Sequence, residues 1–444
     1  MEIEEIKELL EAKKYNALKN KLKEINSADI PVLFEDLDKE HAVKLFRILS
    51  KEQAGEAFSY MDPYMKEKLI QDLTDAELKS IMDELFMDDT VDLIEEMPSN
   101  VVKKILKAVN KEDRKVINEL LKYPDDSAGS IMTTEFVDLK ETMTVEQALQ
   151  RIRDIGIDSE TIYNCYVLNS NRILLGTVNI KEILISKPET LIKDLMTTNV
   201  ISVNTMDDQE EVTKLFDKYD YFALPVVDNE NRLVGIVTVD DAINVIQDEV
   251  AEDFEKMAAI SPSEESYFKT SVFKHAKNRI LWLLILMLSS AVTGGIIAHY
   301  EEAFAAVPLL VSFIPMIMGT GGNCGSQSST LIIRGLATDE IELHDIFKAL
   351  WKEFRVSLLV GVVLAIVNGI RIMIQYQDMQ LAIVIGVTLV ATVMLAKVIG
   401  CLLPLLAKRL KLDPAIMAAP LITTLVDIFS ILVYFQIATT IMGI

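Results

Sequence analysis

A single carboxylate interrupts the last long apolar segment of the chain. Asp427 lies within residues 416–444, which contain no other charged side chain. It follows Pro414 by 13 residues, which is about 20 Å along a helix at about 1.5 Å per residue. A charge at that depth in a bilayer costs about 2.5–3.5 kcal/mol even on lenient scales, so such residues usually face a partner or an aqueous path. Asp427 is therefore a candidate ion ligand, and the structural alternative is an ion pair with Lys397 in the preceding apolar segment.

A glycine-rich run lies in an earlier apolar segment. Pro315 is followed by residues 319–327, which read Gly-Thr-Gly-Gly-Asn-Cys-Gly-Ser-Gln. Glycine lets a second backbone approach closely, as in small-xxx-small pairs such as Gly321 and Gly325. Two interpretations are open. The run either packs tightly as a helix or forms a non-helical break, in which Asn323, Gln327 and freed carbonyls line a polar passage.

Carboxylate and amide oxygens are the ligands that a hard cation such as Mg²⁺ prefers, and Mg²⁺ usually keeps several of its waters. No His, Cys or Met cluster lies near Asp427 in the sequence, which argues against soft metals. The three cysteines are far apart and predict reduced thiols without a disulfide framework. A passage for a hydrated hard cation is the hypothesis that accounts for both Asp427 and the glycine-rich run.

The first part of the chain is strongly acidic. Residues 1–268 carry 31 Lys and Arg against 57 Asp and Glu, whereas residues 269–444 carry 13 against 10. Such a surface repels nucleic acid and attracts cations. Asp88 and Asp92 are four residues apart, so on a helix they share one face and repel each other unless a cation lies between them. The alternative interpretation is that these carboxylates are simply part of a solvated acidic surface and bind no cation.

Five nearly uncharged stretches approach the length of about 20 residues that spans a membrane. They cover residues 280–298, 305–333, 356–374, 381–406 and 416–444. If residue 279 is cytosolic, nearly all flanking Lys and Arg fall on the cytosolic side, as the positive-inside rule requires. The acidic N-terminus lacks the pattern of a signal peptide. The sequence thus predicts a multi-pass protein of the cytoplasmic membrane, with a cytosolic N-terminus, an extracytoplasmic C-terminus and an interfacial helix within residues 338–355.

The soluble part divides into two patterns. Residues 1–126 repeat short amphipathic helices about every dozen residues, which predicts a superhelical stack. Residues 127–250 alternate β-like runs with helices and contain a duplication. Ser130-Ile-Met-Thr-Thr recurs as Asp194-Leu-Met-Thr-Thr, and Val167-Leu-Asn-Ser-Asn-Arg recurs in the related run that begins at Val226. The two units, 127–187 and 188–246, resemble a tandem pair of CBS domains, which commonly sense nucleotides or ions.

The whole chain resembles the MgtE family of magnesium channels. The most specific matches are Pro315 with residues 319–328 in the second stretch and Asp413-Pro with Pro420-Leu-Ile-Thr-Thr-Leu-Val-Asp427 in the fifth. The resemblance implies a multidomain membrane protein. Its expected parts are an α-helical N domain (1–126), the α/β CBS pair, a connecting or plug helix (247–270) and an all-α five-helix transmembrane domain (271–444).

The resemblance also implies a homodimer whose pore is lined by the second and fifth membrane helices. Asp427 matches the family's pore aspartate, which binds hydrated Mg²⁺, and Asn323 matches a pore asparagine. Regulatory Mg²⁺ is expected at cytosolic carboxylates, and Asn244 stands where an aspartate is expected. The matching carboxylates are Asp88, Asp92, Asp241, Glu249, Glu252 and Asp253, with Glu56, Glu210 and Asp220 as weaker matches.

We therefore expect Mg²⁺ uptake that is gated by intracellular Mg²⁺. Scarce Mg²⁺ leaves facing carboxylates to repel each other and frees the plug, whereas abundant Mg²⁺ bridges them. The alternatives are a transporter for Mn²⁺, Co²⁺ or Ca²⁺, and a CBS-based membrane sensor that does not transport. No nucleophile–base pair or ATPase motif indicates an enzyme. Binding of a nucleotide such as ATP by the CBS pair stays open.

Overall fold

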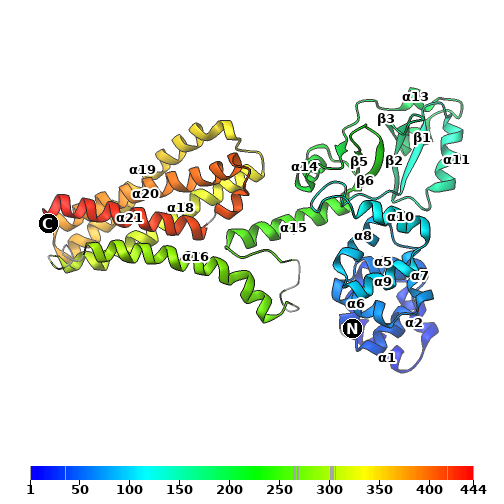
Figure 1. Ribbon diagram of the computed structural model, residues 1–444, viewed down its shortest axis with the longest axis horizontal. Coiled ribbons are helices and arrows are strands. Elements are labelled where there is room, and N and C mark those ends of the chain that lie inside the picture. The colour runs from blue at the N-terminus through cyan, green and yellow to red at the C-terminus, as the bar shows by residue number, and fades with distance from the viewer. Residues whose placement is uncertain are drawn as a thin grey trace. The chain divides into compact units, whose positions relative to one another are not determined.

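The computed structural model describes residues 2–35, 37–263, 267, 270–300, 305, 307–417 and 419–443. Within it the chain divides into two units, Met1–Ile246 and Gln247–Ile444, which we describe separately. Figure 1 shows short helices and two small sheets in the first unit and long helices in the second.

The first part of unit 1 is a stack of short helices. Many of them begin where a side chain accepts a backbone N–H of the first turn, which satisfies donors that the helix leaves unpaired. Such caps are Asp38, Ser50, Asp62, Thr74 and Asn110. The helices are α1 (Glu2–Glu11), α2 (Tyr15–Leu22), η1 (Ser27–Asp29), α3 (Ile30–Glu35), α4 (Lys39–Phe46), α5 (Lys51–Ser59), α6 (Pro63–Asp72), α7 (Asp75–Met82), α8 (Met87–Glu96), α9 (Ser99–Ala108) and α10 (Lys111–Leu120).

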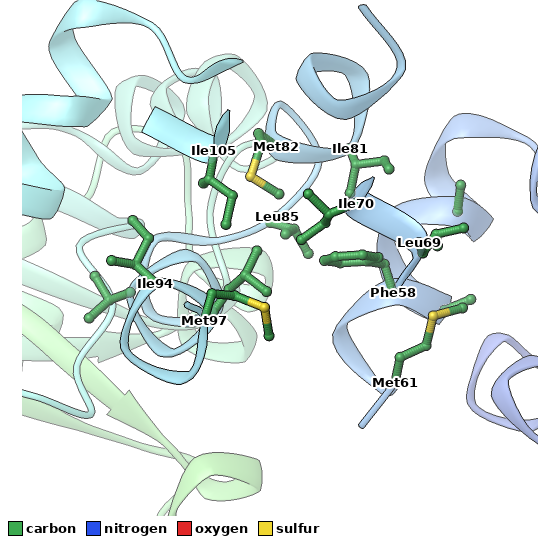
Figure 2. Packing of buried hydrophobic residues seen from close by; sticks show 14 of the residues in the cluster. Phe58, Met61, Leu69, Ile70, Ile81, Met82, Leu85, Ile94, Met97 and Ile105 are labelled. Carbon is green, nitrogen blue, oxygen red and sulfur yellow. The ribbon is translucent and has the colours of Figure 1, made fainter. Parts of the chain in front are cut away.

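One face of each short helix is buried against its neighbours. Figure 2 shows Phe58 of α5 beside Ile70 of α6 and Ile81 of α7, with Ile105 of α9 in the same cluster. Phe58, Ile70 and Ile105 are completely buried. No single helix of this length could bury its apolar face alone, so the stack is held together by contacts between successive helices. The predicted helical domain is confirmed.

Two three-stranded sheets follow, and they repeat one topology. In each sheet the first strand pairs parallel with the second, and the second pairs antiparallel with the third. The duplication read from the sequence is thus a structural repeat. The elements are β1 (Phe136–Lys140), α11 (Val145–Ile155), β2 (Thr161–Leu168), β3 (Leu174–Asn179), α12 (Ile180–Ile185), α13 (Ile192–Leu195), β4 (Val203–Asn204), α14 (Gln209–Tyr219), β5 (Ala223–Val227) and β6 (Leu233–Thr238).

Helix α15 (Val239–Met257) begins directly after β6. The connecting helix predicted from residue 247 onward is therefore the second half of a helix that starts in the second sheet unit. Residues 264–266, 268 and 269 of the predicted connecting segment lie outside the described residues.

Among the described residues, unit 2 contains five helices longer than 20 residues. They are α16 (Val272–His299), α18 (Ile314–Ala337), α19 (Ile346–Tyr376), α20 (Met379–Arg409) and α21 (Ala419–Met442), with short turns η2 (Pro308–Phe313), η3 (Leu343–Asp345) and η4 (Pro414–Met417). Four helical segments of the described chain are long and apolar enough to cross a membrane: Val272–His299, Leu343–Tyr376, Met379–Arg409 and Pro414–Met442. The fifth helix, α18, carries the glycine-rich run.

One of two open interpretations and one local prediction are wrong. Helix α18 is continuous through residues 319–327, so the interpretation as a non-helical break is replaced by that of tight helix packing. In the described residues 338–355 there is no separate interfacial helix. Instead, α19 begins at Ile346 and runs unbroken to Tyr376. At the glycine-rich run, packing against α20 and α21 overrides the weak local preference for a helix. At the start of α19, Ile346 and Leu350 pack against a buried cluster of α18 and α20.

The glycines of α18 let it pack closely against two helices. A Cβ on Gly321 would lie 2.8 Å from Thr392 Cγ2 and 2.9 Å from Ser430 Oγ, and one on Gly325 would lie 2.8 Å from Ile422 Cγ2. A Cβ on Gly400 of α20 would collide with the carbonyl oxygen of Gly325. The backbones of α18 and α20 therefore approach each other at a place where only glycine fits.

Gly400→Ala should destabilise the membrane unit. Overpacking typically costs about 1–3 kcal/mol, and the neighbour here is a backbone carbonyl that cannot rotate away. We expect a lower melting temperature of the detergent-solubilised chain in a tryptophan-fluorescence or thiol-reactivity assay. Gly386→Ala is the matched control in the same helix, because its Cβ would lie 3.7 Å from Ala365. A Gly400→Ala protein as stable as this control would contradict the described packing.

Candidate functional site

One stripe of α18 is exposed and carries the two amide side chains of the glycine-rich run. Pro315, Gly319, Asn323 and Gln327 follow one another at intervals of four residues, and all four are exposed. Residues four apart lie above one another on a helix. A Cβ on Gly319 would meet nothing within 4 Å. The stripe therefore points away from the helices of its own chain and presents two amides on an open surface.

Asp427 lies on α21 beside this helix. A Cβ on Gly322 of α18 would lie 3.0 Å from Thr423 Cγ2, and Asp427 is one turn after Thr423 on the same face of α21. The side chain is half-buried and has no ion-pair partner within the described part of the chain. The structure thus puts the predicted pore carboxylate and the predicted pore amide on two helices that pack directly together.

The alternative interpretation of Asp427, an ion pair with Lys397, is wrong. Lys397 Nζ lies 3.1 Å from Glu353 Oε2 of α19 and donates to Ser328 Oγ of α18 at 3.0 Å. Lys397 and Glu353 are both buried. The lysine is therefore neutralised by a carboxylate from within residues 338–355, the segment expected to lie at the membrane interface.

A cluster of carboxylates forms in unit 1 where the helical domain meets the sheet units. Asp88 at the start of α8 is buried. Burial, followed by the charges of Asp241, Asp89 and Glu160, raises the pKa of Asp88 well above its usual range. Burial together with neighbouring carboxylates also raises the pKa of Asp241 to about 6 and that of Glu160 to about 8. Three separate segments thus bring negative charges together in a partly dehydrated place.

The structure gathers part of the predicted regulatory set and adds to it. Asp88 and Asp241 meet, and Asp92 lies one turn beyond Asp88 with an exposed side chain. Sequence reasoning missed four members of this cluster: Asp89, Glu135, Glu160 and Asp240. Asp89 and Asp240 adjoin predicted residues and could have been included, whereas no local signal marks Glu135 or Glu160.

The carboxylate cluster is not a preformed chelate. Over the described ranges, no group of three or more His, Cys, Asp and Glu side chains converges closely enough to hold a metal ion. Its oxygen atoms are nonetheless all hard ligands. The nearby positive charge of Lys66 acts against the rise in the pKa of Asp89. The chemistry of these donors fits a hydrated hard cation that neutralises the cluster through its waters better than an ion stripped of water.

The second half of α15 carries the other predicted regulatory carboxylates. Glu249, Glu252 and Asp253 are half-buried. Lys256 Nζ lies 2.5 Å from Glu252 Oε1 and 2.7 Å from Asp413 Oδ2, which directly precedes η4 and α21. An internal cation therefore joins the end of α15 to the entry of the helix that carries Asp427.

The remaining predicted residues lie elsewhere in unit 1. Glu56 is exposed on α5, Asp220 is the exposed C-cap of α14, and Glu210 at the start of α14 pairs with Lys214 at 3.1 Å. Asn244 is exposed on α15. Within the described chain, these side chains have no place in the carboxylate cluster around Asp88.

Comparisons with known proteins agree along the chain. Family models match as a divalent cation transporter, MgtE, over residues 314–437, an MgtE intracellular N domain over 25–126 and CBS domains over 128–188 and 192–248. A magnesium transporter MgtE of Thermus thermophilus is 35% identical over 436 residues, which cover 98% of this chain and 97% of that protein. The chain belongs to the MgtE family. A Bacillus subtilis magnesium transporter MgtE is 32% identical over 97% of this chain and 95% of its own length.

Solved structures agree with the fold of the soluble part of this MgtE-family chain. The cytosolic domain of a Mg²⁺ channel MgtE in complex with ATP is 34% identical, with a TM-score of 0.52, and covers 54% of this chain and 98% of its own. The soluble part of a magnesium transporter is 30% identical, with a TM-score of 0.53, and covers 56% and 98%. The predicted combination of helical domain and CBS pair is confirmed.

The carboxylate cluster makes unit 1 sensitive to pH. A carboxyl whose pKa is higher in the folded chain than in the unfolded one holds its proton more tightly when folded. Stability is therefore full at low pH and is lost as the pH rises through the raised pKa. For Asp241 and Glu160 this loss extends from about pH 4 to about pH 8. We expect the melting temperature of the unfolding transition of unit 1 to fall by several degrees across this range, and Mg²⁺ to restore it mainly at the upper end.

Asp88→Asn should flatten that pH profile and weaken the response to Mg²⁺, because it removes the most buried charge of the cluster. Asp83→Asn is the matched control, since Asp83 is an exposed aspartate of the same domain. Differential scanning fluorimetry of the full chain in detergent measures the pH profile and the Mg²⁺ response of each variant. Equal Mg²⁺ responses in the two variants would contradict a role of the carboxylate cluster in cation binding.

Proposed function

We propose that this chain transports Mg²⁺ across the cytoplasmic membrane along a pathway lined by α18 and α21. The observation that carries the proposal is the juxtaposition of the exposed amide stripe of α18 with Asp427 on the adjoining helix. Amide and carboxylate oxygens suit a hard cation that keeps part of its water. Membership of a family described as divalent cation transporters supports it.

The proposed pathway lies between two copies of the chain. A stripe of amides that faced lipid would leave its donors and acceptors without partners, which is costly in hydrocarbon. A second copy against α18 and α21 would enclose Asn323, Gln327 and Asp427 together with their symmetry mates. Two Asp427 carboxylates could then share one hydrated dication, which offsets the cost of placing each of them in the membrane.

The topology in this proposal has five membrane spans, α16, α18, α19, α20 and α21, with the N-terminus in the cytosol and the C-terminus outside. Helix α18 is the least apolar of the five, which is the composition expected of a helix that lines water rather than lipid. The arrangement also leaves unit 1 in the cytosol, where its carboxylates would sample intracellular Mg²⁺.

Asp427→Ala should abolish most Mg²⁺ flux. Interactions with a charged group contribute about 1.5–3 kcal/mol, which corresponds to a loss of about tenfold to hundredfold. Flux into proteoliposomes that contain a Mg²⁺-sensitive dye measures this, and growth of a Mg²⁺-uptake-deficient bacterium gives a second readout. Gln436→Ala is the control, because Gln436 is an exposed polar residue of the same helix.

Rescue of growth by Asp427→Ala would refute the assignment of Asp427 to the pathway. Faster flux of Mn²⁺, Co²⁺ or Ca²⁺ than of Mg²⁺ through the wild-type chain would favour the broader divalent transporter. A folded wild-type protein that carries none of these ions would favour a CBS-based sensor.

Gating in this proposal begins at the cytosolic carboxylates. Mg²⁺ neutralises the carboxylate cluster and stabilises contacts between the helical domain and the CBS pair. Movement of α15 then reaches α21 through the bridge from Lys256 to Asp413, which makes α15 the plug. ATP is a further proposed ligand of the CBS pair, supported by the solved MgtE cytosolic domain in complex with ATP.

Limited proteolysis tests this gating. We expect Mg²⁺ to protect the purified chain from cleavage between residues 240 and 270, because bridging ions hold the domains and α15 together. Asp88→Asn should need more Mg²⁺ for the same protection, whereas Asp83→Asn should behave as wild type. Cleavage at an unchanged rate in the presence of Mg²⁺ would rule out the mechanism.

A further inference from the structure

Three membrane helices are joined by one buried polar network, which we call the Lys397 network. It consists of Lys397 of α20, Glu353 of α19 and Ser328 of α18. Lys397 Nζ lies 3.1 Å from Glu353 Oε2 and 3.0 Å from Ser328 Oγ, and the serine hydroxyl also donates to Glu353. Lys397 is 4% exposed, Glu353 8% and Ser328 0%. All three side chains therefore have partners, and none is open to a passing ion.

Stability alone does not explain such a pair. Replacing a buried ion pair by well-packed apolar side chains is often neutral or stabilising, because the cost of removing two charges from water cancels much of their attraction. Ion pairs that persist inside a protein can instead specify one arrangement of its parts, and that role must be argued from what the pair holds. In this chain the pair holds Ser328, and through it α18.

The middle of helix α18 offers few large side chains that could fix its rotation. There its contact face is built from Gly321, Gly322 and Gly325, against which α20 and α21 pack closely. Larger buried side chains, such as Ile317 and Ile332, lie toward the two ends of the helix. Glycine permits a close approach but provides no side chain that would lock into a neighbouring groove. A smooth face of this kind leaves rotation and sliding of the helix weakly specified. Directional hydrogen bonds supply the missing restraint.

Two consecutive serines tie α18 to its neighbours. Ser328 binds α19 and α20 through the Lys397 network. The hydroxyl of Ser329 donates to the carbonyl of Met417 in η4 at 3.0 Å, directly before α21. Ser328 and Ser329 point about 100° apart around the helix, so together they fix its rotation. The exposed stripe of Asn323 and Gln327 then has one defined direction.

We propose that Lys397 and Glu353 are positioning residues, which act through Ser328 to fix the rotation of α18 and the direction in which Asn323 and Gln327 face the ion pathway. They neither contact the ion nor line its path. The part of this inference that concerns transport rests on the proposed Mg²⁺ pathway, whereas the restraint on α18 does not. Breaking the network should therefore change ion discrimination in a protein that remains folded.

The main variant is the double substitution Glu353→Met with Lys397→Met. It removes both charges together and so avoids leaving one of them buried and unpaired. The milder variant is Ser328→Ala, which keeps the ion pair and removes only its link to α18. Ser357→Ala is the matched control, because Ser357 is also fully buried but its hydroxyl donates within its own helix, to Phe354 O at 2.7 Å.

The native thiol of Cys324 reports the rotation of α18. Cys324 is 6% exposed and packs against α20 and α21. In a chain with Cys165→Ser and Cys401→Ser, we expect the double variant and Ser328→Ala to raise the rate of Cys324 modification by about tenfold, since reactivity follows exposure. Ser357→Ala should leave the rate unchanged. Unchanged Cys324 reactivity in both network variants would overturn the inference.

Proteoliposome flux measured on the same proteins gives the second readout. We expect the ratio of Mg²⁺ to Ca²⁺ and Mn²⁺ flux to fall by about tenfold in the network variants, because binding groups must be held within about 0.5 Å of their working geometry. A folded double variant with wild-type discrimination would overturn the inference. A wild-type chain without Mg²⁺ flux would refute the proposed function, while Cys324 reactivity would still decide whether the network fixes α18.

Discussion

The backbone contact between Gly325 and Gly400 sets the geometry of the membrane unit. Helices in a bilayer gain little from burying apolar side chains against one another, because lipid is equally apolar, so they associate through close packing and hydrogen bonds. Here the glycine face of α18 lies directly against α20 and α21. Two pairs of polar side chains on α18 then have separate surroundings. Ser328 and Ser329 reach neighbouring helices, and Asn323 and Gln327 remain on the open stripe.

Among the described residues, the buried carboxylate of Glu353 is neutralised within unit 2, whereas the carboxylate cluster is not neutralised within unit 1. In the membrane unit Glu353 is neutralised by Lys397, and the bundle keeps Asp427 without an ion-pair partner within the described chain. In unit 1 the carboxylate cluster keeps its excess negative charge, so that folding itself raises the pKa of Asp88 and Glu160. A raised carboxyl pKa means that folding works against ionisation. The carboxylate cluster of unit 1 therefore needs external cations or protons to neutralise its charge, whereas Glu353 is already neutralised by Lys397.

Much of the architecture could be predicted from the sequence because it depends on local patterns. Capping residues such as Ser50 and Thr74 predict where helices begin. The repeated motifs around Ser130 and Asp194 predict the duplicated sheet unit. The wrong or incomplete predictions of side-chain partners concern residues distant in the chain. Lys397 pairs with Glu353, 44 residues away, although Asp427 is nearer in sequence. Likewise, nothing local indicates that Glu160 meets Asp88, because only the docking of two domains brings them together.

The same limit applies to the glycine-rich run. Read alone, four glycines in seven residues weaken a helix, and the sequence left a non-helical break open. Tertiary contacts on the glycine face reverse that preference, since α18 gains from α20 and α21 what its own propensity lacks. Helix propensity could therefore not decide the conformation, although the spacing of Gly321 and Gly325 correctly indicated a close helix contact.

Neutralising Glu353 also has a consequence for the proposed transport. An ion moves through a pore only if its sites bind it strongly enough to let it enter and weakly enough to let it leave. A second free carboxylate in the bundle that contains Asp427 would add a strong site for a divalent cation. Lys397 occupies that carboxylate with a charge that cannot diffuse away, since the ammonium is covalently part of α20. The Lys397 network can thus restrain α18 while leaving Asp427 as the carboxylate available to the ion.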